Sequence, residues 1–259
     1  MPGVRRGPGP AAVLLLLGCL VAVRVTAPPP DGDARAVGSV AVAVGSAVPP
    51  IERLSSAGPL VDADGVQRRI DGRGGAVALT FDDGPDPRWT PAVLDLLQRH
   101  GMRATFCVVG LHVVEHPELV RRIAAEGHAL CDHTWTHEEA LPDRPPATIR
   151  AEIVRAYDAI VAASGGVKPL YYRAPAGRWS PAVVAEAHRL GLRPLGWTVD
   201  PTDWRQPPAA QITRAVLDSV APGSIVLLHD GYGHRAQTLA ALLTILDTLI
   251  TRHLTPTLP

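Results

Sequence analysis

Short apolar runs alternate with longer amphipathic segments from Gly75 to the end of the chain, and this pattern limits the possible folds more than any other feature of the sequence. The apolar runs are typical of buried strands. They predict strands at residues 76–81, 104–109, 128–133, 170–173, 194–199 and 224–229. Strands that are each followed by a helix form a parallel sheet with crossover helices. This many units favour a closed or nearly closed (β/α) barrel.

The segments between these strands carry start and stop signals for helices. Thr90 and Ser180 each precede a proline, which is the order of an N-cap and a first helical residue. Gly101 and Gly191 stand where these two helices should end. The other amphipathic segments predict helices at residues 117–126, 148–164, 209–220 and 235–252.

Composition limits the number of domains and the kinds of partner. The chain has 259 residues, of which 46% are hydrophobic, and this is enough for one large core with an appendage. Its 25 Lys and Arg balance its 25 Asp and Glu, so the summed charge offers no field that would attract nucleic acid or an anionic membrane. We expect a monomer that acts on a neutral substrate and has no nucleic-acid partner.

Residues 1–27 have the features of an export signal. Arg5 and Arg6 precede an apolar run at residues 11–23, which is short for a membrane span. Three kinds of processing are open: cleavage at the end of this segment, lipidation at Cys19, and retention as an anchor. Each places the rest of the chain outside the cytoplasm, either secreted or held on the outer face of the membrane.

Residues 28–74 are rich in Pro, Gly, Ala, Val, Ser and Asp and show no sustained periodicity. A segment of this composition buries too little apolar surface to fold alone. It predicts a mostly disordered linker that leads to a catalytic domain at residues 75–259.

Polar residues gather where the predicted strands end. In (β/α) barrels the loops that follow the strands converge on one face, where the active site lies. The residues at these positions are Asp82, Asp83, His133, His137, Arg173, Asp200, Asp203 and His229. Because they recur at the same end of successive units, we expect them to share one site.

Asp83, His133 and His137 are candidate ligands for one metal ion. Side chains of adjacent strand residues diverge, so Asp83 can bind a cation while Asp82 faces the substrate. His133 and His137 are four residues apart, a spacing that puts both imidazoles on one face of a helical turn. Alone, the two motifs are also compatible with a simple turn and a solvated histidine pair. Together they supply two imidazoles and one carboxylate, with a position left for water, as in catalytic zinc sites.

Five motifs occur in a fixed order along the chain: Thr80-Phe81-Asp82-Asp83-Gly84-Pro85, His133-Thr134-Trp135-Thr136-His137, Arg173-Ala174-Pro175-Ala176-Gly177, Asp200-Pro201-Thr202-Asp203-Trp204 and Leu227-Leu228-His229. They resemble the motifs of the NodB-type polysaccharide deacetylases, carbohydrate esterase family 4, which includes chitin and peptidoglycan N-deacetylases and some acetylxylan esterases. The resemblance extends from Gly75 to the C-terminus. It implies a distorted (β/α) barrel of the polysaccharide deacetylase type that removes acetyl groups from a carbohydrate polymer.

The resemblance also implies a division of roles. Asp83, His133 and His137 would hold a divalent cation, zinc in the first place and cobalt or nickel otherwise. Asp82 would be the general base that takes a proton from the attacking water. Arg173 would pair with this base and fix its orientation.

The remaining roles belong to residues of the last three motifs. His229 would be the general acid that protonates the leaving amine or alkoxide, and Asp203 would orient it. The backbone N–H of Ala176 would stabilise the oxyanion, although the family often has a tyrosine at this position. Trp204 and Leu227 would line the pocket for the acetyl methyl group, with ordinary core packing as the alternative for each.

Several other residues have open interpretations. Trp135 and Trp179 lie in motif loops and are candidates for stacking on sugar rings. His234 follows the last motif and is a candidate for substrate contact. Cys107 and Cys131 lie in neighbouring predicted strands, where a disulfide and two buried thiols are both compatible with the sequence.

We expect N-deacetylation of N-acetylglucosamine units in peptidoglycan or a chitin-like polymer. O-deacetylation of acetylxylan by the same site is the alternative, since the motifs do not separate amide from ester cleavage. A glycan-binding relative without activity belongs to another class, and the complete set of ligands, base, acid and orienting residues argues against it. A metal phosphohydrolase fits less well, because the sequence shows ligands for only one cation and no phosphate-binding glycine loop.

Overall fold

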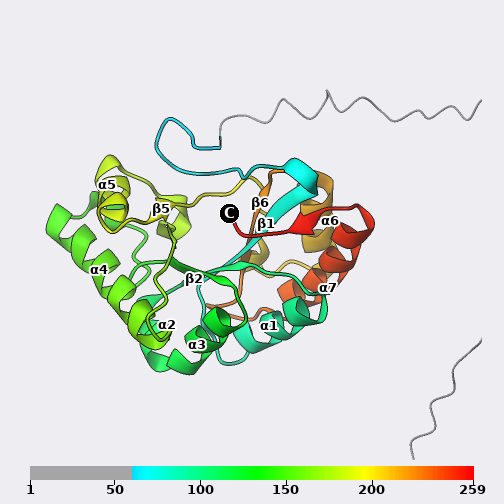
Figure 1. Cartoon of the computed structure of the whole chain (residues 1–259), viewed down its shortest axis with the longest axis horizontal. Coiled ribbons are helices and arrows are strands. Elements are labelled where there is room, and N and C mark those ends of the chain that lie inside the picture. Colours follow the sequence, from blue (N-terminus) through cyan, green and yellow to red (C-terminus); the bar gives the residue numbers. More distant parts are fainter. Residues whose placement is uncertain (1–59) are drawn as a thin grey trace, which may run out of the picture. The chain divides into compact units, whose positions relative to one another are not determined.

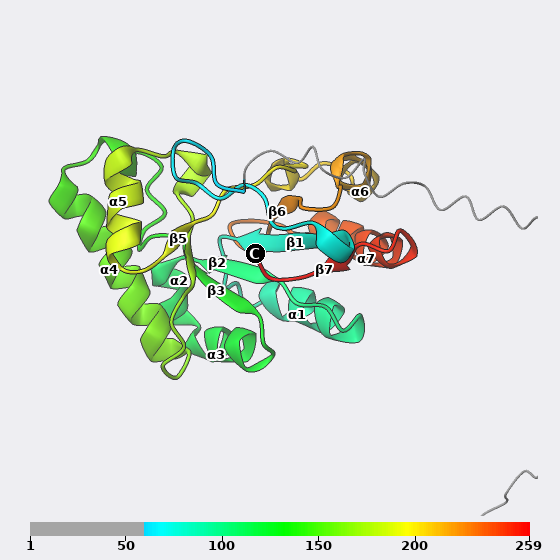
Figure 2. The same cartoon turned by 45° about the horizontal axis from the view of Figure 1, so that its top comes forward.

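The computed structural model describes residues 60–259, which form a curled parallel sheet with helices on its outer side (Figure 1, Figure 2). The sheet has the order β5-β4-β3-β2-β1-β6, with β7 also paired to β1. All the paired strands run parallel. The strands are β1 (Ala76–Asp82), β2 (Thr105–Val108), β3 (Ala129–Asp132), β4 (Tyr171–Tyr172), β5 (Arg193–Pro194), β6 (Ile225–His229) and β7 (Thr255–Pro256).

Helices follow the strands as the alternating pattern predicts. They are α1 (Thr90–Arg99), α2 (Gly110–Glu115), α3 (Pro117–Ala125), α4 (Pro146–Ala163), α5 (Pro181–Arg189), α6 (Ala209–Ser219) and α7 (Ala236–Thr251). Helices α4 and α5 pack together beside β3 to β5, and α6 packs on α7 (Figure 1). Short 3₁₀ turns occupy η2 (Arg73–Gly75), η3 (Leu141–Asp143), η4 (Pro175–Gly177) and η5 (Asp203–Arg205).

Apolar side chains pack on both faces of the sheet. The face on which each polar residue at a strand end lies follows from the alternation along its strand. Successive strand residues face opposite sides. Phe81 stacks on Phe106 in the outer layer beneath the helices, with ring centroids 5.3 Å apart. Ala78 and Tyr171 pack in a separate inner cluster. Asp82 follows Phe81 in β1 and therefore points to the inner side of the curled sheet.

The sheet is nearly closed by an irregular segment at residues 193–199. Its start pairs with β4, since the Leu195 N–H donates to the Tyr172 carbonyl. Its end bridges to β6, with Val199 beside Val226. This part of the chain therefore crosses from one edge of the sheet to the other. The regular strand predicted at residues 194–199 is observed only at its beginning.

Cys107 and Cys131 form a disulfide that joins β2 to β3. The two cysteines are direct neighbours in the parallel ladder. The bond settles the choice that the sequence leaves open.

The observed helix boundaries confirm one predicted cap and correct two other expectations. Ser180 caps α5 by accepting a hydrogen bond from the Val183 N–H at 3.3 Å, as predicted. Thr90 does not cap α1, because Trp89 holds the cap position and the Thr90 hydroxyl donates instead to Asp230 at 2.6 Å. Helix α2 is absent from the prediction, since one short turn directly after a strand gives no periodic pattern.

Residues 60–74, within the expected linker, pack against the domain. Val66 is fully buried and Ile70 is 5% exposed. Gln67 bridges to Leu195, and the Ile70 N–H donates to Gly223. The ordered domain therefore begins before the predicted boundary at residue 75.

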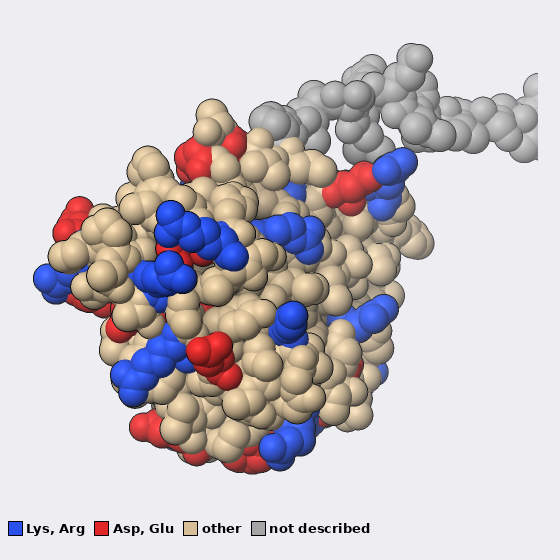
Figure 3. Space-filling model, turned by 60° about the vertical axis from the view of Figure 1, so that its left-hand side comes forward, with Lys and Arg blue, Asp and Glu red and all other residues tan. Residues whose placement is uncertain are grey.

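The predicted export signal and most of the predicted linker lie outside the described residues. Within residues 60–259, no helix is both long and apolar enough to span a bilayer. Figure 3 shows the face around α4 and α5, where basic and acidic side chains are scattered among a larger uncharged surface.

Candidate active site

The carboxyl ends of the strands surround a cavity of about 570 Å³. Asp82 at the end of β1 is level with His229 at the end of β6, so the parallel register brings these two motifs together. Nine residues predicted for the site line the cavity: Asp82, Asp83, His133, His137, Ala176, Asp200, Trp204, Leu227 and His229. Arg173 and Asp203 lie behind this lining, in contact with Asp82 and His229 respectively. The sequence therefore identified the residues that meet here.

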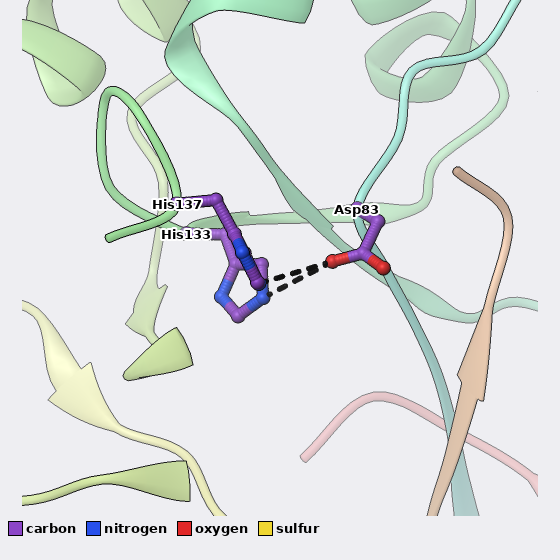
Figure 4. A group of neighbouring side chains, drawn as sticks. All are labelled: Asp83, His133 and His137. Atoms are coloured by element: carbon purple, nitrogen blue, oxygen red, sulfur yellow. Dashed lines mark ion pairs between the residues drawn. The ribbon is translucent and has the colours of Figure 1, made fainter. Parts of the chain in front are cut away.

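Asp83, His133 and His137 bring their side chains to one point (Figure 4). The Asp83 carboxylate lies 3.3 Å from Nε2 of His137 and 3.6 Å from Nε2 of His133. Metal–ligand bonds of about 2 Å at tetrahedral angles place two ligand atoms about 3.3 Å apart. Two imidazoles and one carboxylate are also the donors that catalytic zinc sites use. The three residues fit a divalent cation.

The two histidines reach this point by a different backbone path from the predicted one. Residues 133–137 form no helical turn, since Thr134 and His137 have φ of 67° and 59°. The Asp132 carboxylate accepts from the Thr134 N–H at 2.8 Å, and the Thr134 hydroxyl accepts from the His137 N–H at 3.0 Å. These bonds stabilise a tight loop that directs both rings into the cavity. The four-residue spacing correctly predicted that the two rings meet at one point. The predicted helical turn is wrong.

His133 is oriented by its other ring nitrogen. Its Nδ1 lies 2.8 Å from the Arg173 carbonyl oxygen, so Nδ1 carries the hydrogen and Nε2 is left to bind a metal. Burial alone would lower the pKa of His133, but the charges of Asp82 and Asp83 outweigh it and raise the pKa. Burial would likewise raise the pKa of Asp83, yet its contact with His133 and the charges of the nearby histidines lower it to about 2. The ligand carboxylate is therefore ionised.

Asp82 is held by a buried arginine. Arg173 is fully buried, and its Nη1 donates to Asp82 Oδ1 at 2.6 Å. The same guanidinium donates to the Thr80 hydroxyl and to the carbonyls of Leu195 and Gly196. The second Asp82 oxygen faces the cavity, 3.6 Å from Nε2 of His133. The predicted pairing of Arg173 with Asp82 is thus present.

His229 is paired with Asp203. Its Nδ1 lies 2.7 Å from Asp203 Oδ1, and its backbone N–H donates to the other Asp203 oxygen at 3.0 Å. The Thr238 hydroxyl also donates to that oxygen at 2.8 Å. Burial disfavours the imidazolium, but the hydrogen bond to Asp203 and the surrounding carboxylates raise the pKa of His229 to about 9. The side chain therefore holds a proton at neutral pH, as an acid must.

The three residues assigned to substrate contact have different surroundings. Ala176 has φ of 51° within η4, so its peptide is turned into an uncommon left-handed conformation at the cavity wall. Trp204 is 47% exposed, which favours substrate contact over core packing. Leu227 is 4% exposed and lines the cavity while it is also part of the packed strand β6.

Several lining residues were missed from the sequence. Trp197 lies in the irregular segment at residues 193–199. Its place in the alternation of apolar residues along that segment was the sequence signal that could have identified it. Tyr232 and Arg235 follow β6 in the loop that was considered only for His234. Glu139 follows the histidine motif, and no pattern marks it.

Three proposed substrate contacts lie elsewhere. Trp135 is 8% exposed and is covered by the Arg155 guanidinium, 3.8 Å from its ring centroid. Trp179 packs edge-on against Tyr172. His234 lies against Trp89 at a centroid distance of 4.9 Å. None of the three lines the cavity, so the idea that they contact sugar is not supported.

Known proteins resemble this chain over most of the described residues. The family model for polysaccharide deacetylase matches residues 69–195. A chitooligosaccharide deacetylase of Bradyrhizobium sp. (strain ANU 289) is 46% identical over 157 residues, which cover 61% of this chain and 71% of the relative. A peptidoglycan-N-acetylglucosamine deacetylase of Bacillus cereus is 39% identical over 176 residues, or 67% and 81% of the two chains. The crystal structure of the Bc1960 peptidoglycan N-acetylglucosamine deacetylase has a TM-score of 0.70 at 32% identity, and covers 73% of this chain and 88% of that one.

The cavity brings Asp82 and His229, a candidate base and a candidate acid, beside three candidate metal ligands, an arrangement typical of metal-dependent hydrolases. The relatives narrow this class, because their identity to this chain extends over most of their own length. The chain belongs to the polysaccharide deacetylase family. It is an enzyme that removes acetyl groups by hydrolysis, as its five motifs implied.

Proposed function

We propose that this enzyme removes the acetyl group from N-acetylglucosamine units of a chitin-like or peptidoglycan polymer. The observation that carries the proposal is the meeting of Asp82, His229 and the three metal ligands in one cavity. The names of the relatives, a chitooligosaccharide and a peptidoglycan-N-acetylglucosamine deacetylase, support this substrate class.

The residues divide the reaction between them. A divalent cation held by Asp83, His133 and His137 would supply a Lewis acid for the acetyl carbonyl and the attacking water. Asp82 would accept a proton from that water at its cavity-facing oxygen, while Arg173 holds the other oxygen still. The Ala176 N–H would donate to the developing oxyanion.

His229 would complete the reaction from the other side. Its Nε2 proton would pass to the leaving nitrogen as the carbon–nitrogen bond breaks, which yields acetate and a free amine. Asp203 holds Nδ1 at 2.7 Å and stabilises the imidazolium before transfer. The same steps would release an alcohol from an acetyl ester, so acetylxylan is the second candidate substrate.

We also propose zinc as the cation, because the donor set of two imidazoles and one carboxylate suits it. Residues 1–27 are proposed to export the chain, by a cleaved signal, a lipidated Cys19 or a retained anchor, and residues 28–59 to link this segment to the domain. The Cys107–Cys131 disulfide supports export, since such bonds persist outside the cytosol. We further propose a monomer, and the balanced charge argues against a nucleic-acid partner.

Acetate release tests the function directly. The purified enzyme, loaded with zinc, cobalt or nickel, would be assayed on chitooligosaccharides, peptidoglycan and acetylxylan, with a chelated sample as control. We expect acetate from N-acetylglucosamine polymers and none after chelation. Activity confined to acetylxylan would overturn the substrate assignment, and activity that survives complete removal of metal would overturn the mechanism.

A further inference from the structure

Tyr232 has an exposed side chain on an unfavourable backbone. The residue lines the cavity and is 44% exposed. Its φ is 45°, a left-handed conformation that is a genuine outlier for a bulky residue. Such conformations are unfavourable and persist where the surrounding structure enforces them.

Buried polar contacts enforce this conformation. Arg235 is 3% exposed, and its guanidinium donates to the Gly231 carbonyl at 2.7 Å and to the Tyr232 carbonyl at 2.6 Å. The Trp89 indole N–H donates to the Gly233 carbonyl at 2.8 Å. The loop is therefore fixed on both sides of Tyr232.

The loop is also fitted closely to the turn that carries the ligand carboxylate. A Cβ atom at Gly231 would lie 2.1 Å from the Asp83 carbonyl oxygen, so only glycine allows this approach. The position of Tyr232 relative to the metal ligands is thus set by backbone packing as well as by hydrogen bonds.

The Tyr232 ring packs at a tilt against two histidine rings. Its centroid is 5.3 Å from that of His137 and 4.7 Å from that of His112. His112 in turn has its Nδ1 2.8 Å from the Asp83 carbonyl oxygen. Tyr232 also lines the cavity that Asp83 and His137 line.

We propose that Tyr232 is a specificity-determining residue, whose ring packs against the sugar next to the unit that loses its acetyl group. The inference rests on the proposed function. Pyranose rings present faces of C–H groups, and tyrosine offers a large apolar face with few rotatable bonds. A cavity of about 570 Å³ lies within the range of ligand pockets and exceeds the needs of one acetyl group.

The test compares substrates of increasing length. The kcat/KM for acetate release would be measured on N-acetylglucosamine oligomers of one to six units, with Tyr232→Ala, Tyr232→Phe and the parent. We expect Tyr232→Ala to lower kcat/KM on the long oligomers about tenfold more than on the monomer, mainly through KM. Tyr232→Phe keeps the aromatic face and should retain the parental ratio.

Leu243→Ala is the matched control, because Leu243 is a similarly exposed apolar residue on α7, at 46%, and does not line the cavity. It should leave the length dependence unchanged. An equal loss on all lengths in Tyr232→Ala, or a loss confined to kcat, would mean that the ring only supports His137, and this would overturn the inference.

Binding provides a second readout. Calorimetric titration of the N-acetylglucosamine tetramer would be done in an Asp82→Asn background, with and without Tyr232→Ala. Weaker tetramer binding in the double variant is expected. If the tetramer binds through Tyr232 but the parent releases no acetate, the proposed function fails, and only the contact between Tyr232 and sugar is supported. If acetate is released but Tyr232→Ala changes neither binding nor the length ratio, only this inference fails.

Discussion

Arg173 orients both Asp82 and His133. Its side chain holds Asp82 at 2.6 Å, and its backbone carbonyl accepts from Nδ1 of His133. The proposed base and one proposed metal ligand are thus positioned by a single residue. The division of tasks between neighbouring residues follows from this arrangement, because Asp82 is bound to the arginine and Asp83 is free to face the histidines.

The separate roles of the acid, the base and the ligands can be tested by substitution. Asp82→Asn and His229→Ala should each lower kcat by about 10²- to 10⁴-fold, the usual contribution of a general acid or base. Both variants should keep a metal content near that of the parent, whereas Asp83→Ala should lose the metal. Acetate release and elemental analysis of the same samples measure this. Loss of metal from either of the first two would show that the roles are wrongly divided.

The pH profile should report the His229–Asp203 pair. The pair raises the pKa of His229 to about 9, so the imidazolium is favoured in the folded state. The contribution of this pair to the stability of the folded state is complete below the unfolded-state pKa of about 6.5. It is lost as the pH rises through the folded-state pKa of about 9. We expect kcat/KM to fall on the alkaline side near pH 9, and Asp203→Asn to move this fall to lower pH. An unshifted pH profile in Asp203→Asn would contradict the orienting role proposed for Asp203.

At the scale of elements, the site could be predicted because parallel strands deliver their ends to one place. The apolar runs located β1, β3 and β6 closely enough to group Asp83, His133 and His229. The loops could not be predicted. The left-handed turn at Thr134 is held by hydrogen bonds within residues 132–137, and the turn at Tyr232 by Arg235 and, from a distant part of the chain, by Trp89. The apolar pattern that located the strands carries no signal for either turn.

The cap of α5 is a local feature that the sequence did reveal. Ser180 satisfies the Val183 N–H, which has no partner inside the helix. Ser180→Ala should therefore reduce the free energy of unfolding by about 1 kcal/mol, and Ser180→Asp should keep most of it. Urea denaturation followed by circular dichroism measures the difference. Equal stability of the parent and Ser180→Ala would mean that the cap contributes nothing.

On the scale of the whole molecule, the proposed metal ligands come from segments about fifty residues apart, since Asp83 follows β1 and His133 follows β3. A ligand that binds only the folded state stabilises it by mass action, by about 2.7 kcal/mol at a hundred times Kd. Zinc should therefore raise the Tm of the parent, and chelation should lower it again. Asp83→Ala should not respond to zinc in the same melting experiment. An equal shift in that variant would place the cation elsewhere.

The nearly closed sheet explains how an arginine can be buried at its centre. Where residues 193–199 leave the regular ladder, the carbonyls of Leu195 and Gly196 turn toward the interior and accept from Arg173. In an uninterrupted strand those oxygens would bond to a neighbouring strand, and the guanidinium would be left with unsatisfied protons. The irregular segment thus supplies the carbonyl oxygens that bind the positively charged guanidinium of Arg173. A variant with a regular strand at this place would gain ladder bonds and lose the support that Arg173 gives to Asp82.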